Sequence, residues 1–583
     1  MESDGCPPNT IRISSQYLYL TNSLNKGCLV LLHSGTPFCI LKKKYHSFRT
    51  CMPELIFAYI PIVLLVYLMG KSDSMSASKA LPLIAMLVYF IMLIVYQHDA
   101  NLVHATVVKG LLLALTPVCI IAGAIFLFRC METSGALNVI RTGLNHVSTN
   151  PIAQLMIIGW AFAFLIEGAS GFGTPAAIAA PILFSLGFPA IRVAIACLIF
   201  NTVPVTFGAV GTPIWFGLSV ISLSPAELAE IAWQAALVNT IAAPFVVVAG
   251  LALVVSSRKL IWQNLTFILL STFSCTLPYL LLSKFSTEFP SLLGGLIGLV
   301  CSIVLAKHNI GLQKNTPKDP ESAQAITPAT VLKATFPLWA TVLMLIATRV
   351  QELGIKPLLL SNEPAWAFSL GQLGELKISA SLVVSLNHIF QTPQSWQHSI
   401  LYVPSLLPFV VIALATLWLH RQGSAKEALV HTKQKMAGPF FALLGALVFV
   451  QLMMLGDSAS AVNQIGNHLA RLTGANWEFF APFLGALGTF FSGSATISNL
   501  TFAGIQQSIS AQLELSLVAI LAMQSVGAAM GNMVCINNIV AVNSILGLEK
   551  QEGYILKRTV LVLLLYGTVA GTASVLLLAP QHG

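Results

Sequence analysis

The sequence predicts an all-α polytopic membrane protein. Of its 583 residues, 56% are hydrophobic and only 9% are charged, and the mean hydropathy is +0.82. A soluble chain of this length would form about four domains, with roughly 25% charged residues to cover them. The shortage of charge excludes that class, and it also excludes coiled coils and disordered tails. The apolar runs are continuous rather than alternating, which favours helices over a membrane barrel.

Apolar segments recur along the whole chain from residue 55 onward. Several approach the ~20 residues that a helix needs to cross the hydrocarbon layer. Counting shorter stretches that Gly and Pro interrupt, we expect about 12 to 14 spanning helices. The clearest segments are Leu55–Gly70, Ala80–Tyr96, Gly110–Phe128, Pro151–Ile166, Ile231–Val255, Trp262–Leu282, Phe289–Ala306, Leu401–Leu419, Ala437–Leu455 and Thr559–Ala579.

Positive charge gathers in alternate loops between these segments. The net charge is +9, from 30 Lys and Arg against 21 Asp and Glu, and the loops near Asp99 and Glu288 carry little of it. Such an excess marks cytoplasmic loops and is no argument for a nucleic-acid partner. The longest polar stretch, residues 307–335, is therefore expected to be a cytoplasmic linker. It would separate a first membrane half, residues 52–306, from a second, residues 336–583.

Residues 1–51 do not fit this alternation. They are rich in Ser, Asn and Cys, and their basic cluster at residues 42–49 would lie outside, against the positive-inside trend. Because a convincing first span follows Met52 at once, we hypothesise that translation begins there. A genuine, unstructured extension is the alternative. The ten cysteines of the chain include no C-x-x-C pair and no metal-ligand spacing, so we expect no metal site and no cofactor.

Two stretches rich in Gly and Pro interrupt the first half. They are Glu167–Pro175 (EGASGFGTP) and Asn201–Pro213 (NTVPVTFGAVGTP). Three glycines and a proline within nine residues cannot comfortably continue a helix. Non-helical backbone at membrane depth is tolerated only where it is buried in protein or lines a wet cavity. Two ordinary surface loops are the alternative, although both stretches lack the Lys and Arg that the other loops carry.

The second half repeats part of this pattern. Ser492–Thr496 (SGSAT) has the order Ser-Gly-x-small-Thr of Ser170–Thr174 (SGFGT), and Gly527–Gly531 is a near-echo of Gly208–Gly211. Apolar segments interrupted by Gly at corresponding places in two halves indicate a transporter binding site between structural repeats. Close packing of helices through small residues is the alternative explanation.

Together these stretches resemble the bacterial lactate permease family, also described as lactate and glycolate permeases. The resemblance runs from about Met52 to Leu578, and the string EGASGFGTPAAIAAPIL carries it most specifically, followed by SGSATISN. Some members have Ala in place of Ser170 and Thr174, and Lys in place of Asn532, which leaves the preferred substrate open.

The resemblance implies a multi-pass protein of the bacterial inner membrane, built from inverted repeats with helical hairpins. It implies proton symport of L-lactate and related 2-hydroxy monocarboxylates, such as D-lactate and glycolate. The alternative within this class is a transporter of another small organic anion in the same superfamily. The expected partners are the substrate, H+ and the lipid bilayer, without nucleic acid.

A site for such a substrate must hold a carboxylate and a hydroxyl group. Broken helices offer free backbone N–H groups at the positive end of the helix dipole, and short hydroxyl and amide side chains add further donors. Capping or bonding within a helix is the structural alternative for each hydroxyl. The expected substrate-binding residues are Ser170, Gly171, Gly173, Thr174, Asn201, Thr202, Gly211, Thr212, Ser492, Gly493, Ser494, Thr496, Ser498 and Asn499.

Glu167 is the expected proton-coupling residue. It is the only charged residue in the stretch 151–186. An ionisable group at membrane depth is by default a candidate for function. The alternative is a structural partner that bonds the re-entrant backbone. Arg192, Arg349 and Glu352 are further charged candidates.

An intramembrane enzyme is the competing interpretation. Gly168–Gly171 fits the G-x-S-G pattern around the nucleophile of rhomboid-type membrane proteases, with Ser170 as the serine. That chemistry needs a His within hydrogen-bond reach, and the later histidines fall in or beside polar loops or in an ambiguous stretch. The second Ser-Gly pair at Ser492 would also have no use in a protease. We therefore expect a transporter without catalytic residues.

Overall fold

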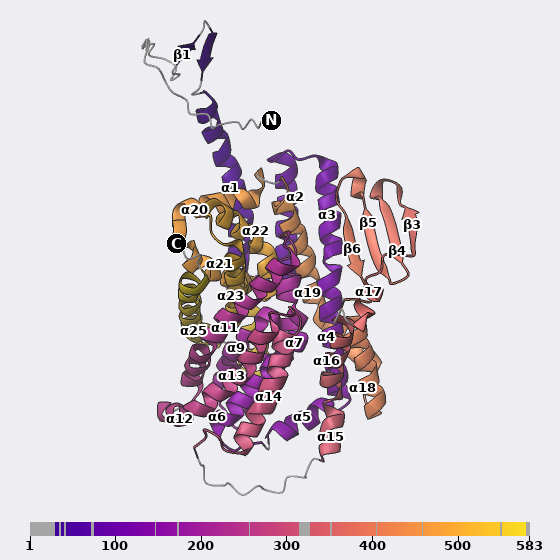
Figure 1. Cartoon of the computed structure of the whole chain (residues 1–583), viewed down its shortest axis with the longest axis vertical. Coiled ribbons are helices and arrows are strands. Elements are labelled where there is room, and N and C mark those ends of the chain that lie inside the picture. The colour runs from indigo at the N-terminus through magenta and orange to yellow at the C-terminus, as the bar shows by residue number, and fades with distance from the viewer. Residues whose placement is uncertain are drawn as a thin grey trace, which may run out of the picture. The chain divides into compact units, whose positions relative to one another are not determined.

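Helices that are long and apolar enough to cross a membrane dominate the computed structural model (Figure 1). Among the residues that it describes, nine helices meet this criterion, and a pair bent by 45° forms a tenth span. Three shorter apolar helices, Glu54–Met69, Phe336–Arg349 and Leu406–His420, add to these. The predicted class, a helical multi-pass membrane protein, is confirmed.

The structure describes residues 30–33, 36–39, 42–70, 75–145, 147–171, 174–255, 257–313, 327–349, 353–403, 405–456, 459–548 and 551–578. Residues 1–57 and 58–583 form two separate units. The described part of the first unit is an antiparallel pair, β1 (Val30–His33) and β2 (Thr36–Cys39), and the start of α1 (Lys42–Gly70). Most of the predicted extension 1–51 therefore lies outside the described residues, as does the middle of the predicted linker 307–335, residues 314–326.

After α1, the described residues of the first half contain thirteen α-helices up to residue 307. They are α2 (Ala77–Ile94), α3 (Ala100–Leu113), α4 (Leu115–Thr133), α5 (Ala136–Asn145), α6 (Pro151–Gln154), α7 (Ala163–Ser170), α8 (Thr174–Ser185), α9 (Ala190–Phe200), α10 (Gly208–Trp215), α11 (Pro225–Val254), α12 (Arg258–Gln263), α13 (Leu265–Leu282) and α14 (Pro290–Lys307). A π-helical segment, η1 (Leu155–Phe162), joins α6 to α7, and a 3-10 segment, η2 (Val203–Phe207), leads into α10.

The second half begins with α15 (Pro328–Ala334), α16 (Phe336–Arg349) and α17 (Ile355–Leu359). After a β-sheet, it continues with η6 (Leu406–Val411), α18 (Ile412–His420), α19 (Ala425–Met453), α20 (Ala461–Thr473), α21 (Trp477–Ser492), α22 (Ala495–Leu513), α23 (Leu517–Met530), η9 (Gly531–Val534), α24 (Ile536–Leu546), α25 (Glu552–Ala573) and η10 (Ser574–Leu578).

The sheet is a feature that the sequence analysis did not anticipate. Its strands β3 (Ala365–Ser369), β4 (Glu375–Ser379), β5 (Val383–Asn387) and β6 (Trp396–Ser399) pair antiparallel in chain order. The sheet packs against α3, where Leu386 and Trp396 cover Ala105. The side chains of Lys109 and Gln394 are hydrogen-bonded at 2.8 Å, which adds a polar contact between α3 and the sheet.

The two halves share one order of elements around their breaks. In the first half, α7 ends in a break before α8, and α9 leads through the 3-10 segment η2 into α10. In the second half, α21 ends in a break before α22, and α23 leads through the 3-10 segment η9 into α24. The similar sequences Gly208–Gly211 and Gly527–Gly531 do not occupy corresponding places in this order, because Gly527 lies inside α23. A Cβ on Gly527 would lie 1.8 Å from the Pro482 carbonyl oxygen, so this glycine serves close helix packing.

Two of the spans that lead into breaks are shielded from lipid. In the apolar window of the span Pro151–Ser170, 94% of the residues are buried, and the value for Leu517–Asn543 is 89%. The other long spans are 39% to 61% buried, as expected of helices with one face towards lipid. Both spans therefore run through the interior of the large unit.

A buried polar network joins the two halves at this centre. Asn239 of α11 donates hydrogen bonds from Nδ2 to the hydroxyls of Thr206 and Tyr279, at 2.8 and 2.7 Å. The Tyr566 hydroxyl of α25 donates to Asn239 Oδ1 at 2.6 Å. One amide therefore satisfies three buried hydroxyl groups, and unsatisfied groups would be costly here.

Replacing Asn239 should destabilise the whole unit. The substitution Asn239→Leu keeps the side-chain size but leaves Thr206 and Tyr566 without this partner, at a cost of about 1–3 kcal/mol for each buried unpaired group. Tyr279 would keep only its longer hydrogen bond to the Val203 carbonyl oxygen, at 3.4 Å. Thermal unfolding of the purified protein in detergent should show a lower midpoint. Tyr566→Phe removes a single hydrogen bond and should lower the midpoint less. Equal midpoints for Asn239→Leu and the wild type would contradict this role.

Candidate functional site

Glu167 lies where α7 ends. Its side chain is buried, and Oε2 accepts a hydrogen bond from Asn201 Nδ2 at 2.9 Å. The helix ends there because Gly171 takes a φ of +62° with an extended ψ, a conformation that glycine adopts readily. The carboxylate thus stands at the first break and is bonded to the start of the second.

Gly208 makes room for the other oxygen of this carboxylate. A Cβ at position 208 would lie 2.4 Å from Glu167 Oε1, closer than real Cβ atoms come to a neighbour. A Cβ on Gly171 would lie 3.5 Å from the same oxygen. Glu167 is therefore enclosed by Asn201 on one side and by glycine backbone on the other.

The second break contains a left-handed turn. Ala209, Val210 and Gly211 have φ values of +46°, +57° and +71°. For residues with a side chain this conformation costs roughly 1–2 kcal/mol each, and it is rarest for β-branched residues such as Val. Trp215 supports the turn by donating its indole N–H to the Val210 carbonyl oxygen at 2.9 Å. Strained backbone of this kind clusters at functional sites.

The break in the second half is held by short hydroxyl side chains. Gly493 ends α21 with a φ of +73°. Ser494 then caps α22 by accepting a hydrogen bond from the Ile497 N–H at 3.3 Å. Ser492 donates to the Gly488 carbonyl oxygen at 2.7 Å. The arrangement places the N-terminus of a 19-residue helix at the break, with the positive end of its dipole.

One small cavity brings the two breaks together. Its volume is about 20 Å³, room for roughly one water molecule. The first half contributes Glu167, Gly171, Val205, Gly208, Ala209 and Pro213, and the second half contributes Gly493, Ser494, Ala495, Thr496 and Asn532.

Asn499 ties the halves together beside this cavity. Its Nδ2 donates to the Pro213 carbonyl oxygen at 2.8 Å, between residues 286 positions apart in the chain. Pro213 lies two residues after the left-handed turn, so the amide of α22 holds the second break of the first half in place. Ser498 lies one residue earlier and donates to Gly485 of α21 at 2.6 Å.

A larger cavity leads towards the site from the side of the basic loops. Its volume is about 340 Å³, and its walls include the basic residues Arg129, Arg141 and Lys435 and the buried amides Asn201 and Asn532. Asn532 lines the small cavity as well. Asn201 Oδ1 is buried and has no hydrogen-bond partner among the residues that the structure describes. An acceptor is therefore available next to Glu167.

Most of the predicted substrate-binding residues fall into two groups. Those that line the small cavity are Gly171, Gly493, Ser494 and Thr496. Those whose hydroxyl or amide groups bond within the protein are Ser170, Asn201, Thr202, Thr212, Ser492, Ser498 and Asn499. Gly211 packs instead against the Thr287 carbonyl, whereas Gly173 and the side chain of Thr174 lie outside the described residues.

Gly208 and Asn532 line the site but were not among the predicted binding residues. Gly208 stands in the second motif, and only the three-dimensional packing shows that it faces Glu167. Asn532 is an amide in an apolar stretch, a signal that the sequence carries because such groups need partners in a membrane. In the structure its Oδ1 accepts a hydrogen bond from Asn538 Nδ2 at 2.6 Å.

Comparison with known proteins identifies the family. The family model described as L-lactate permease matches residues 54–579. This chain belongs to the L-lactate permease family. The family is one of transporters rather than enzymes, so the protease interpretation of Ser170 is not supported.

Individual members of the L-lactate permease family match over most of their length. A relative from Haemophilus influenzae, assigned by name to the L-lactate permeases, is 45% identical over 90% of this chain and 99% of its own. The L-lactate permease of Escherichia coli is 26% identical, over 83% and 88% of the two chains. The glycolate permease of the same organism is 24% identical, over 82% and 88%. Among solved structures, the YdaH transporter of Alcanivorax borkumensis aligns with a TM-score of 0.39 and 16% identity, over 90% and 98% of the chains.

A methyl group at position 208 should disrupt the site around Glu167. Gly208→Ala forces Glu167 away from its position and breaks its bond to Asn201. The loss of a hydrogen bond to a charged group, about 1.5–3 kcal/mol, should lower L-lactate uptake by about tenfold or more. Initial uptake rates per amount of protein in the membrane measure this. Gly438→Ala is the matched control, because no atom lies within 4 Å of its added Cβ, and equal rates for the two variants would contradict the site.

Proposed function

We propose that this permease is a secondary active transporter that takes up L-lactate and related 2-hydroxy monocarboxylates by proton symport across the bacterial inner membrane. The observation that carries the proposal is the buried Glu167, bonded to Asn201, in the cavity where the breaks of both halves meet. The names of the L-lactate and glycolate permeases among its relatives support the substrate class.

The charges around the larger cavity suit an anionic substrate. Arg129, Arg141 and Lys435 line its outer part, and Glu132 lies beside them in an ion pair with Arg129. Cationic clefts raise the local concentration of anions. At the inner end, the N-terminus of α22 provides the positive end of a helix dipole, which attracts a carboxylate. The hydroxyl group of a 2-hydroxy acid is a donor that matches the free Oδ1 of Asn201.

The size of the small cavity implies that transport involves a conformational change. A volume of about 20 Å³ accepts one water molecule but no monocarboxylate. The breaks that form its walls must therefore separate to admit substrate. Gly171 and Gly493, with positive φ, and the left-handed turn Ala209–Gly211 are the points at which the backbone can change direction.

Glu167 has the surroundings that proton coupling requires. An ionised carboxylate in this site accepts from Asn201 Nδ2, as observed. Once protonated, the same group becomes a donor and can bond an oxygen, either of the substrate or of Asn201 after its amide rotates. A second anion beside an ionised Glu167 would be strongly disfavoured in a buried site. Binding of the substrate anion therefore favours uptake of a proton by Glu167.

The remaining predictions fit within this proposal. The residues that line the cavity, Gly171, Gly493, Ser494 and Thr496, are proposed to contact the substrate, and the hydroxyls and amides that bond within the protein are proposed to hold the breaks. The segment 307–335 is proposed to be a cytoplasmic linker, and Met52 is proposed as the start of the functional chain.

Uptake and exchange measured side by side test the role of Glu167. Wild-type protein in proteoliposomes should accumulate labelled L-lactate when an inward proton gradient is imposed, with D-lactate and glycolate as competitors. Glu167→Gln keeps the hydrogen-bonding shape but cannot titrate. It should still exchange lactate at equal concentrations across the membrane and should fail to accumulate lactate against a gradient.

A control variant carries its substitution at an exposed carboxylate. Glu230→Gln changes an exposed carboxylate of α11 and should leave both activities at the wild-type level. Accumulation by Glu167→Gln that still follows the pH gradient would remove this residue from the coupling mechanism. A wild-type protein whose uptake is saturable but indifferent to the proton gradient would reject symport itself.

A further inference from the structure

Arg349 is a buried cation that the proposed mechanism does not use. It is the last residue of α16, and it is 8% exposed. A buried guanidinium is normally hydrogen-bonded to a carboxylate or to carbonyl groups, because leaving its five N–H donors without acceptors costs free energy. Here Nε and Nη1 have no hydrogen-bond partner within the described part of the chain.

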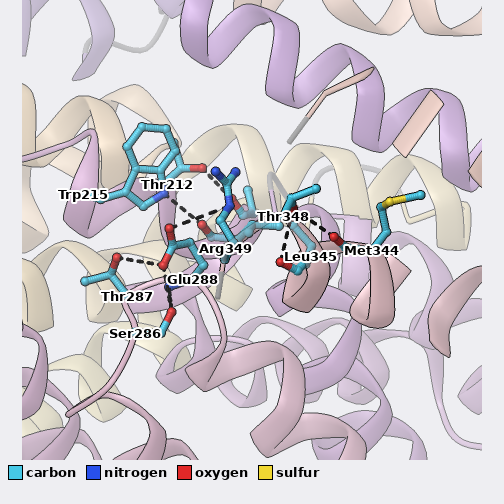
Figure 2. A network of polar contacts seen from close by, with 11 residues as sticks. Thr212, Trp215, Ser286, Thr287, Glu288, Met344, Leu345, Thr348 and Arg349 are labelled. Carbon is cyan, nitrogen blue, oxygen red and sulfur yellow. Dashed lines mark hydrogen bonds and ion pairs between the residues drawn. The ribbon is translucent and has the colours of Figure 1, made fainter. Parts of the chain in front are cut away.

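The only ion pair of Arg349 among those residues is a loose one. Its Nε lies 3.9 Å from Glu288 Oε1, beyond the length of a charge-assisted hydrogen bond. The carboxylate of Glu288 is held by its own loop, where Ser286 donates to Oε2 at 2.7 Å and Thr287 at 3.4 Å. Figure 2 shows Arg349 reaching towards Glu288, with Ser286 and Thr287 on the far side of that carboxylate.

An aromatic ring lies against the guanidinium of Arg349. The Arg349 Cζ lies 3.8 Å from the centre of the Tyr402 ring. A cation over an aromatic face is attracted to it, while the N–H groups at the edge stay available. An oriented guanidinium with free edge donors is the arrangement that binds a carboxylate by two parallel hydrogen bonds.

The pair also contacts the strained turn of the second break. A Cβ on Gly211 would lie 1.8 Å from the Thr287 carbonyl oxygen and 3.1 Å from the Glu288 Cα, so the loop rests directly on this residue. At the other end of the same turn, Gly208 contacts Glu167. The turn Ala209–Gly211 thus lies between Glu288 and Glu167. Figure 2 shows Thr212 and Trp215, which follow the turn, beside the pair.

Arg349 stands at the end of α16 away from the basic loops. The helix starts after α15, which packs on α5, and it ends before α17 and the sheet. Figure 1 shows α5 and α15 together at one end of the large unit, with α17 and the sheet further along. The larger cavity with Arg129, Arg141 and Lys435 belongs to the α5 end.

We propose that Arg349 is a second carboxylate-binding site, where the monocarboxylate substrate first binds. This site serves the side of the membrane opposite the larger cavity with Arg129, Arg141 and Lys435. The substrate carboxylate accepts two parallel hydrogen bonds from one edge of the guanidinium, either Nε with Nη2 or Nη1 with Nη2, and displaces Glu288. Release of Glu288 and its loop from Gly211 frees the left-handed turn, which opens the way to Glu167. The substrate identity rests on the proposed function.

The test compares transport from the two faces of the membrane. Initial rates of labelled L-lactate uptake are measured in right-side-out and everted vesicles that contain the full chain. For uptake from the side of the membrane on which Glu288 lies, Arg349→Gln should raise the KM by about tenfold or more, because the charge-assisted contact with the carboxylate is lost, while kcat changes little. For uptake from the opposite side of the membrane, where the larger cavity with Arg129 lies, the KM should stay within about twofold of the wild-type value, because substrate that enters there does not bind Arg349 first.

Three further variants sharpen the comparison. Arg349→Lys keeps the charge without the fork and should raise the KM less than Arg349→Gln. Glu288→Gln removes the competing carboxylate and should lower the KM from its own face. Arg471→Gln changes an exposed arginine of α20 and should leave both faces unaffected.

Direct binding separates this inference from the proposed function. Binding of acetate to the purified full chain, followed by saturation-transfer NMR, should weaken in Arg349→Gln, whether or not lactate is the transported substrate. If the wild-type protein takes up no lactate, and acetate binding is nevertheless weaker in Arg349→Gln than in the wild type, the proposed function is rejected but the carboxylate site is kept. Unchanged acetate binding, an unchanged KM, or an equal rise of the KM from both faces would overturn the site.

Discussion

The buried carboxylate of Glu167 is the constraint on which the rest of the structure depends. A charge at the centre of a membrane protein requires donors that approach it closely, and an unbroken helix offers none. The chain meets this need with Asn201, whose amide bonds the carboxylate, and with Gly208, whose missing side chain leaves room for it. The breaks in the helices and the polar network behind them keep these two residues in place.

The second break, from η2 to α10, is held by contacts at several points. The left-handed turn Ala209–Gly211 touches the Glu167 site through Gly208 and the Glu288 loop through Gly211. Asn499 of the second half anchors its end at Pro213. A turn held against its backbone preference can change state when one of these contacts is released. This explains why so many glycines and short polar side chains gather within a few residues.

Much of this could be predicted from the sequence, because the relevant signals are local. A lone Glu in an apolar span and the pairs Ser170–Gly171 and Ser492–Gly493 mark the breaks without knowledge of the fold. The role of Gly208 and the loose pair of Arg349 could not be predicted, because both depend on neighbours far away in the chain. The sheet was missed because its strands have only four or five residues each. The similarity of Gly527–Gly531 to Gly208–Gly211 suggested a corresponding break at Gly527, because the sequence does not distinguish a glycine in close helix packing from a glycine in a break.

The central claim is that the breaks of the two halves form one substrate site around Glu167. The most direct measurement is a cryo-EM structure of the full chain in lipid nanodiscs at saturating L-lactate, compared with one without it. The account predicts density for the substrate between Glu167 and the N-terminus of α22, in a cavity larger than the present 20 Å³. Lactate density that touches neither Glu167 nor Gly493–Thr496, with this cavity unchanged, would contradict it.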